Sequence, residues 1–323
     1  MKSSGETTAD ILDAPGPPLS KFADPWITAE GQPRARVALE RLQTLWFNTG
    51  TLCNLTCHHC YIESSPRNDR LVYLTRKEVE VFLDEIDEKA LGTEEIGLTG
   101  GEPFMNPELI DILRLCLERG YRVLLLTNAM RPMMKQAEGL KSLRAFGDRL
   151  TLRVSLDHYS ALVHEAERGA RSWQPTVAGL QWLKQEGFCI AVAGRRLSGE
   201  SEAELRAGYQ QLFTDLGLAL DAQDPAQLVL FPEMDAAADV PEITEACWGI
   251  LGKSPRDVMC ASSRMVVKRK GAEKPVVVAC TLLPYQPAFE LGQSLKEASG
   301  EVSLNHPHCA RFCVLGGASC SAR

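Results

Sequence analysis

The stretch QTLWFNTGTLCNLTCHHCY, residues 43–61, joins a strand-forming run to a loop that carries three cysteines. Its first part, QTLWFN (43–48), predicts a β-strand, and from there strand-like and helix-like segments alternate along the chain. Further strands are expected over 94–98, 121–128, 149–157, 188–197 and 226–232, and helices over 75–90, 107–120 and 201–217. Roughly six strand–helix units in a row predict an α/β fold with a parallel sheet and outer helices. We expect an open, partial (β/α)6 TIM-like barrel, with its site at the carboxyl ends of the strands.

Cys53, Cys57 and Cys60 lie on the loop that follows the first predicted strand, at that edge of the sheet. Three thiolates bound to a four-iron cubane cluster satisfy three irons and leave the fourth open for a substrate or cosubstrate. The alternative is a zinc knuckle in which His58 or His59 supplies the fourth ligand. The adjacent histidines are awkwardly placed for that role, and no partner motif follows nearby.

Composition bounds the class of protein. The 323 residues carry a formal net charge of −7, which argues against a nucleic-acid-binding surface. No apolar run reaches the roughly 18–20 residues of a transmembrane helix, and the N-terminus lacks the apolar core of a secretory signal. We therefore expect a cytoplasmic protein with no membrane partner. In a reducing compartment its 11 cysteines would be metal ligands or buried thiols rather than disulfides.

Two motifs carry a resemblance to a known family. CNLTCHHC (53–60) has the CxxxCxxC spacing of the radical S-adenosylmethionine (SAM) superfamily, and Tyr61 fits the aromatic residue common after it. LTGGEPFMNPEL (98–109), which follows the second predicted strand, resembles the GGEP segment of the same superfamily. A GGE triplet alone is a weak signal, but its place one strand after the cysteine loop makes the pair specific. The resemblance covers roughly residues 43–231.

The resemblance implies a SAM-binding 4Fe–4S cluster on Cys53, Cys57 and Cys60. Gly100 and Gly101 would let the backbone approach the methionyl amino group of SAM, and Glu102 would accept a hydrogen bond from it. Residues at later strand ends would contact the ribose or carboxylate, or would only cap the next turn. A guanidinium from Arg195 or Arg196 would pair with the carboxylate. The implied SAM-binding residues are Tyr61, Gly100, Gly101, Glu102, Asn128, Ser155, Asp157 and Arg195.

The strand–helix rhythm ends near residue 236, and six cysteines follow. Residues 260–280 predict a β-hairpin that turns at Gly271 and has a cysteine at each end, and a helix is expected around 287–298. This order, with HPHCARFCVLGGASC (306–320) after it, resembles the SPASM/twitch accessory region. The resemblance implies an auxiliary 4Fe–4S cluster, with Cys260, Cys280, Cys309 and Cys313 as its ligands.

The auxiliary ligand set stays open at two points. Cys309 and Cys313 are separated by three residues rather than the two of the accessory pattern, so Cys320 or Cys247 could replace one of the four ligands. Buried thiols or a zinc site are the alternatives to a cluster. Cys116 and Cys189 fall within a predicted helix and a predicted strand and are interpreted as core residues.

The family resemblance implies an enzyme that cleaves SAM reductively and uses the 5′-deoxyadenosyl radical to abstract hydrogen from a small metabolite or a peptide, leading to oxidation or rearrangement. An external electron donor such as flavodoxin or ferredoxin is implied as well. We divide the chain into a mobile arm (1–36), a radical SAM core (37–235) and a small α+β auxiliary cluster domain (236–323). The competing hypothesis is a non-catalytic iron–sulfur or zinc protein with structural or redox-sensing cysteines. The GGEP segment favours the enzyme, because a structural metal site needs no glycine pair and carboxylate after the next strand.

Overall fold

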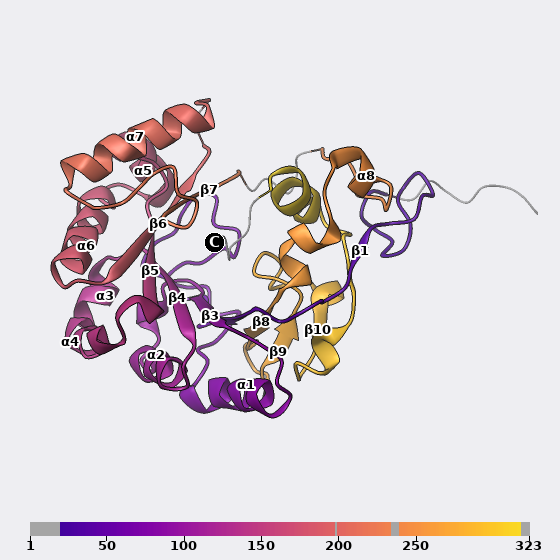
Figure 1. The fold of residues 1–323 in the computed structure, drawn as a ribbon, viewed down its shortest axis with the longest axis horizontal. Coiled ribbons are helices and arrows are strands. Elements are labelled where there is room, and N and C mark those ends of the chain that lie inside the picture. The colour runs from indigo at the N-terminus through magenta and orange to yellow at the C-terminus, as the bar shows by residue number, and fades with distance from the viewer. Residues whose placement is uncertain (1–19, 198, 234–238, 318–323) are drawn as a thin grey trace, which may run out of the picture.

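The computed structural model describes residues 20–197, 199–233 and 239–317, which are arranged around one large sheet (Figure 1). In the described part of the chain this sheet has nine strands, in the order β10-β9-β8-β2-β3-β4-β5-β6-β7. Strands β2 to β7 follow one another in sequence and pair in parallel, which confirms the predicted partial (β/α)6 barrel. Their bounds are β2 Thr44–Asn48, β3 Glu95–Thr99, β4 Arg122–Thr127, β5 Leu150–Ser155, β6 Cys189–Arg195 and β7 Leu228–Phe231.

Helices cover the outer face of this sheet, on the left and lower side of Figure 1. The expected helices are present as α1 (Arg76–Glu88), α2 (Leu109–Glu118) and α7 (Glu202–Asp215). Capping boxes begin both α1, at Thr75 with Glu78, and α7, at Ser201 with Glu204. Four helices without a predicted counterpart lie between β4 and β6: α3 (Arg131–Lys135), α4 (Ala137–Lys141), α5 (Ala161–Arg168) and α6 (Trp173–Gln185). Short 3-10 turns occupy Pro103–Met105 and Arg144–Arg149.

Two buried clusters hold the fold together, one on each face of the sheet. Leu45 and Phe47 of β2 face the helices and pack with their apolar sides. Trp46, between them, points to the opposite face and packs with the segments after residue 240. This alternation follows from the period of two in a strand. Because both faces are covered, the central strands are mainly apolar, as in other parallel sheets.

Three of the C-terminal strands continue the large sheet. The predicted hairpin is present as β8 (Ser263–Val267) and β9 (Val276–Val278), which pair in antiparallel fashion, and Gly271 in its turn has φ +81°. Strand β8 also pairs in parallel with β2. The remaining elements are α8 (Cys247–Leu251), the two-stranded pair β1 (Arg36–Val37) with β11 (Val302–Ser303), 3-10 turns at Pro255–Asp257 and Met259–Ala261, and a π-helix over Cys309–Leu315.

The helix predicted around 287–298 is wrong. The segment forms 3-10 turns at Pro287–Phe289 and Glu297–Ser299, with strand β10 (Glu290–Gly292) between them, paired to β9. Two causes are visible. Gly292 takes φ +133°, which interrupts a helix, and the backbone N–H groups of Leu295 and Lys296 donate to the Glu85 carboxylate on α1 instead of to a preceding turn.

The described part of the predicted mobile arm, residues 20–36, is packed rather than loose. Arg34 is 1% exposed and its guanidinium lies 2.5 Å from Glu242. The Glu242 carboxylate also accepts hydrogen bonds from the backbone of Phe22 and Ala29. A buried ion pair that satisfies neighbouring backbone groups fixes this segment against residues 239–245. Residues 1–19 lie outside the described part of the chain.

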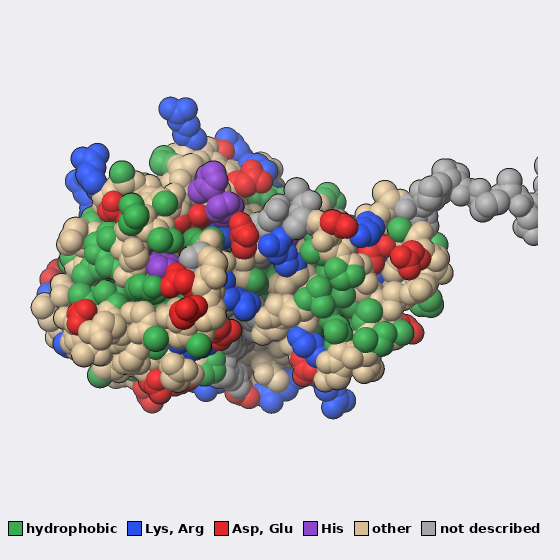
Figure 2. All heavy atoms as spheres, turned by 90° about the horizontal axis from the view of Figure 1, so that it is seen from above, with side chains coloured by type: hydrophobic (Ala, Val, Ile, Leu, Met, Phe, Trp, Pro, Cys, Tyr) green, Lys and Arg blue, Asp and Glu red, His purple; other side chains and the backbone are tan. Residues whose placement is uncertain are grey.

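The outer surface mixes charges of both signs. On the face seen in Figure 2, acidic and basic side chains are interspersed with hydrophobic ones. Among the described residues no helix is both long and apolar enough to cross a bilayer.

Candidate functional site

The carboxyl ends of the parallel strands surround a cavity of about 160 Å³. Its walls come from the cysteine loop after β2, the glycine pair after β3, the ends of β4, β5 and β6, and α5. The C-terminal part of the chain closes one side with Leu282 and Phe312. Of the predicted site residues, the cavity is lined by Cys53, Cys57, Cys60, Tyr61, Gly100, Gly101, Asn128, Ser155, Asp157 and Arg195. The parallel topology thus brings residues more than 140 positions apart to one edge, since carboxyl ends of neighbouring parallel strands meet there.

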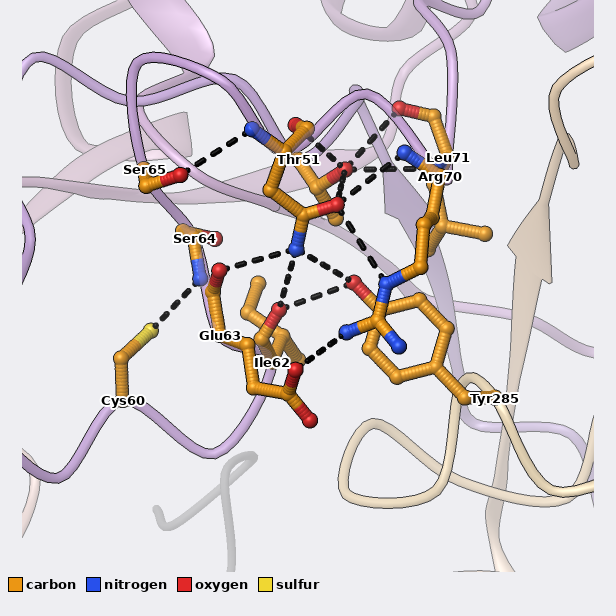
Figure 3. A network of polar contacts seen from close by, with 10 residues as sticks. Thr51, Cys60, Ile62, Glu63, Ser64, Ser65, Arg70, Leu71 and Tyr285 are labelled. Atoms are coloured by element: carbon orange, nitrogen blue, oxygen red, sulfur yellow. Dashed lines mark hydrogen bonds and ion pairs between the residues drawn. The ribbon is translucent and has the colours of Figure 1, made fainter.

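The three thiols of the cysteine loop face this cavity together. Backbone N–H groups donate to two of them, from Leu55 to Cys53 Sγ (3.4 Å) and from Ser64 to Cys60 Sγ (3.3 Å; Figure 3). Such bonds favour the thiolate form that metal binding requires. Burial acts the other way and raises the pKa of Cys53 to about 12 and that of Cys57 to about 11. A bound metal cluster would therefore have to displace protons from these thiols.

The donor set fits a cluster with one open iron. Three thiols on one loop share a cavity that extends beyond them to polar strand ends. In a cubane each thiolate binds a different iron, so the ligands need not meet at one point. Among the described residues, no three His, Cys, Asp or Glu side chains come together as a group for a single metal ion.

The segment after the cysteines is tied to the C-terminal part of the chain (Figure 3). The Tyr285 hydroxyl donates to the carbonyl of Ile62 (2.8 Å) and accepts from Asn68 Nδ2 (3.2 Å). Arg70 stacks over the Tyr285 ring, 3.7 Å from its centroid, and pairs with Glu63. The segment after the cysteines therefore contacts both the sheet and Tyr285, which lies five positions after Cys280 in the sequence.

The glycine pair packs against the cysteine loop itself. An added Cβ at Gly101 would lie 2.2 Å from the carbonyl oxygen of Leu52, and one at Gly100 would lie 2.5 Å from that of Gly50. The Gly101 N–H donates to Gly50 O (2.8 Å), and the Glu102 N–H donates to Leu52 O (3.1 Å). The backbone at Gly100 and Gly101 therefore packs closely against the cysteine loop. A side chain at either glycine would force that loop to move.

Glu102, predicted to accept from the amino group of SAM, is not among the residues that line the cavity. Its carboxylate is buried and accepts from Thr127 Oγ1 (2.8 Å), Asn128 N (2.8 Å) and Phe104 N (3.2 Å). Burial raises the pKa of Glu102 to about 7. The carboxylate therefore braces the end of β4 behind the cavity wall. This bracing places Asn128, whose side-chain amide donates to Asn54 Oδ1 of the cysteine loop (2.9 Å).

Asp157 reaches the cavity together with a partner that sequence reasoning missed. Arg168, at the end of α5, makes a bidentate ion pair with Asp157, with distances of 2.7 and 3.0 Å. Burial opposes this charge, but Asp157 and the nearby Cys57 and Cys53 sulfurs outweigh it and raise the pKa of Arg168. A permanent positive charge thus stands beside the thiols. In the sequence, the signal that could have indicated this ion pair was Arg168 itself, a basic residue eleven positions after Asp157 and directly before Gly169.

A second network on α5 holds the cysteine loop. Glu167 Oε1 lies 2.6 Å from Arg195 Nη1 and accepts from His59 N (2.8 Å), while Oε2 lies 2.7 Å from His59 Nδ1. The carbonyl of Glu167 accepts from His58 N (2.8 Å). This places His58 and His59 in contacts with α5 rather than as ligands of one ion. Arg195 Nη2, by contrast, is buried with no hydrogen-bond partner.

Four of the C-terminal cysteines share a second, smaller cavity, of about 20 Å³. Cys260, Cys280, Cys309 and Cys313 all line it, among apolar side chains. Burial raises the pKa of Cys260 to about 11, and burial together with the sulfurs of Cys280 and Cys260 raises that of Cys309. Leu282 lines both cavities, so one side chain stands between them.

Cys116, Cys189 and Cys247 do not line this second cavity. Cys247 begins α8, where its sulfur accepts from Thr244 N (3.4 Å). Cys320 lies outside the described residues. Cys116 is fully buried in α2, as expected of a core residue, and Cys189 is half-buried in β6.

Comparison with known proteins agrees with this arrangement. The model of the radical SAM superfamily matches residues 47–204. The antilisterial bacteriocin subtilosin biosynthesis protein AlbA of Bacillus subtilis is 31% identical over 142 residues, 44% of this chain and 30% of that protein. The AdoMet-dependent heme synthase of Methanosarcina barkeri is 34% identical over 140 residues, 42% of this chain and 37% of that protein. The matched part thus spans about a third of the length of these relatives.

The fold is similar beyond the matched segment. The crystal structure of Streptococcus suis SuiB bound to S-adenosylmethionine superposes with a TM-score of 0.57 at 13% identity, over 78% of this chain and 63% of SuiB. That similarity covers fold alone. The cysteine loop, the glycine pair and the family match agree on one assignment. Residues 47–204 match the radical SAM superfamily and form a radical SAM domain.

Proposed function

We propose that this chain is a radical SAM enzyme that reductively cleaves SAM at a 4Fe–4S cluster on Cys53, Cys57 and Cys60, and uses the 5′-deoxyadenosyl radical to abstract hydrogen from a small metabolite or a peptide. The observation that carries the proposal is the shared cavity, in which three thiols of one loop face the polar ends of β4, β5 and β6. The cluster and SAM supply the one-electron chemistry. The chain supplies binding, orientation and exclusion of water.

Two guanidinium groups are suited to the carboxylate of SAM. Arg168 lies beside the Cys57 sulfur, and Arg195 lines the same cavity with a buried Nη2 that has no partner. A carboxylate acceptor would satisfy that nitrogen with a charge-assisted hydrogen bond. Asn128 and Ser155, at the ends of β4 and β5, offer amide and hydroxyl groups for the ribose, and Tyr61 offers an aromatic face.

The second cavity is the proposed site of the auxiliary cluster. Four thiolates saturate a cubane, so this cluster would have no iron open for SAM. Cys260 lies in the 3-10 turn before β8 and Cys280 lies two residues after β9, so they flank the hairpin, and Cys309 and Cys313 lie in the π-helix. We accordingly assign the radical SAM core to residues 37–235 and the auxiliary part to 236–323. Clusters in both sites would require reduced cysteines, which favours the cytoplasm as the compartment, with a flavodoxin or ferredoxin as the external electron donor.

The substrate would occupy the apolar side of the first cavity. Leu126, Phe231, Leu282 and Phe312 line that side, and the Phe231 and Phe312 rings lie 5.5 Å apart. A peptide is supported by the fold similarity to SuiB, which has also been solved bound to its precursor peptide SuiA. A small metabolite is supported by the identity to the heme synthase. Oxidation and rearrangement both remain within the proposal.

The test measures 5′-deoxyadenosine after anaerobic reconstitution, reduction with dithionite and addition of SAM. The wild type and Cys116→Ala, which removes a thiol outside both sites, should form it. Cys57→Ala should not, although its fold survives. Cleavage that persists in Cys57→Ala, or a cluster-loaded wild type that never cleaves SAM, would exclude the proposal in favour of a non-catalytic iron–sulfur or zinc protein.

A further inference from the structure

Arg264, on β8, is a buried cation that, within the described part of the chain, donates its hydrogen bonds to neutral carbonyls. Its side chain is 1% exposed. Nε donates to Ala298 O (2.9 Å), Nη2 to Gly300 O (3.0 Å), and Nη1 to Cys260 O (2.5 Å) and Ser263 O (2.8 Å). These acceptors orient the guanidinium but carry no negative charge.

Two other arginines of this chain with little exposure each have a carboxylate partner. Arg34, equally buried, lies 2.5 Å from Glu242, and Arg168 is held by both oxygens of Asp157. Among the described residues no ion pair joins Arg264 to an Asp or Glu, and no carboxylate is among the groups that shift its pKa. A buried charge without an opposite charge is strongly unfavourable, so its retention calls for a compensating anion.

The groups that offer negative charge near Arg264 are thiols. Burial lowers the pKa of Arg264, and the sulfurs of Cys260 and Cys280 oppose that effect. Both cysteines line the second cavity with Cys309 and Cys313. Because Arg264 Nη1 also donates to the carbonyl of Cys260, which lines the second cavity, this cation lies beside the four thiols.

We propose that Arg264 is the counter-cation of a negatively charged metal–thiolate cluster held by Cys260, Cys280, Cys309 and Cys313, and that its charge raises the reduction potential of that cluster. This inference rests on the auxiliary cluster of the proposed function. Four thiolates outweigh the positive charge of an iron–sulfur core, and reduction adds one further electron. A nearby fixed cation in a medium of low dielectric constant stabilises the reduced form more than the oxidised form. Arginine keeps its proton in proteins, so the effect is permanent.

A structural role is the competing explanation, because Arg264 also joins β8 to residues 298–300 through its hydrogen bonds. Two variants separate charge from hydrogen bonding. Arg264→Gln keeps an amide donor but removes the charge, and Arg264→Lys keeps the charge but loses the planar fork of donors. Arg34→Gln is the matched control, because it neutralises a buried arginine that pairs with Glu242 and does not line either cavity.

The experiment uses the full-length chain with Cys53, Cys57 and Cys60 all changed to Ala, so that only the auxiliary site can hold iron. Each Arg variant is made in this parent, reconstituted anaerobically, and assayed for iron per chain. The midpoint potential is then measured by titration with dithionite, monitored by electron paramagnetic resonance.

We expect Arg264→Gln to lower the ratio of reduced to oxidised cluster at least tenfold at a fixed potential, a shift of about 59 mV for a one-electron couple. Arg264→Lys and Arg34→Gln should stay near the parent. Loss of iron in Arg264→Gln with retention in Arg264→Lys would also support the counter-cation. Equal effects of Gln and Lys, or no effect of Gln, would overturn it. A parent that binds no iron would instead refute the auxiliary cluster of the proposed function, which distinguishes the two failures.

Discussion

Glu167 holds His59 by two hydrogen bonds, one to the ring and one to the backbone. His59 Nδ1 lies 2.7 Å from Glu167 Oε2, and His59 N lies 2.8 Å from Oε1. The same carboxylate pairs with Arg195, and the Glu167 carbonyl accepts from His58 N. One residue at the end of α5 therefore fixes the segment between Cys57 and Cys60 to the strand that carries Arg195.

Replacing Glu167 should loosen that segment. Hydrogen bonds to charged groups are worth roughly 1.5–3 kcal/mol, so Glu167→Gln should accelerate loss of the first cluster to a chelator about tenfold or more. Glu165→Gln, on the same helix but with its carboxylate on Trp173 N, is the control. The measurement is the rate of iron release from reconstituted protein. Equal rates for the two variants would show that Glu167 does not hold the loop.

Gly101 should not tolerate a side chain. Its Cβ would lie 2.2 Å from Leu52 O and 2.7 Å from Thr51 O, and backbone atoms cannot swing aside. We expect Gly101→Ala to destabilise the fold by about 1–3 kcal/mol, as overpacking does, and to reduce cluster loading. Gly249→Ala is the control, since an added Cβ there meets nothing within 4 Å. Urea unfolding and iron content measure both effects, and a Gly101→Ala protein that matches the control would refute the close approach.

Arg168 should contribute to SAM binding beyond its ion pair with Asp157. Arg168→Met alone leaves Asp157 buried and unpaired, which should destabilise the protein. Adding Asp157→Asn removes that penalty and should restore most of the stability. The affinity for SAM, measured by anaerobic titration, should stay at least tenfold below wild type in the double variant. Restored SAM affinity there would mean that Arg168 acts only through Asp157.

His164 should make the protein less stable in mild acid. Burial, with help from Arg168, lowers the pKa of His164 to about 4, and neither ring nitrogen has a hydrogen-bond partner. The unfolded chain binds a proton near pH 6.5 whereas the folded chain does not, so stability is full above about pH 6.5 and falls toward pH 4. The expected loss is about 1.4 kcal/mol for each pH unit in that window.

The check is urea unfolding of the metal-free protein at pH 7 and pH 5. His164→Leu should show a smaller difference between the two pH values than wild type. The comparison must be made between the two proteins, because burial also lowers the pKa of His306 to about 4 and adds a slope common to both. An unchanged difference in His164→Leu would contradict the prediction.

Sequence patterns predicted the sheet because its strands are locally encoded. β2 to β7 are short apolar runs bounded by turn residues, and the cysteine and glycine motifs sit directly at strand ends. The helix predicted around 287–298 failed for a tertiary reason, since Glu85 of α1 takes the N–H groups of Leu295 and Lys296. Tertiary contacts of this kind override the intrinsic helix propensity of a segment.

Site residues that belong to sequence motifs or strand ends were predicted. Site residues whose position depends on how a helix packs against the sheet were missed. Asn128, Ser155 and Arg195 could be placed because each ends a strand. Glu102 also follows a strand end, three residues after β3, but the neighbouring end of β4 occupies its carboxylate. Glu167 and Arg168 reach the cysteine loop only through the way α5 packs, and no spacing within the sequence encodes that contact.

The most direct test of the three-thiolate site is whether SAM binds its open iron. The measurement is the electron paramagnetic resonance spectrum of the reduced, reconstituted protein with and without SAM. A variant with Cys260 and Cys280 both changed to Ala removes the signal of the proposed second cluster. If Cys53, Cys57 and Cys60 hold a cluster with one free iron beside Arg168 and Arg195, SAM should change the spectrum in wild type and in this variant. A cluster-loaded protein whose spectrum is the same with and without saturating SAM would contradict the account.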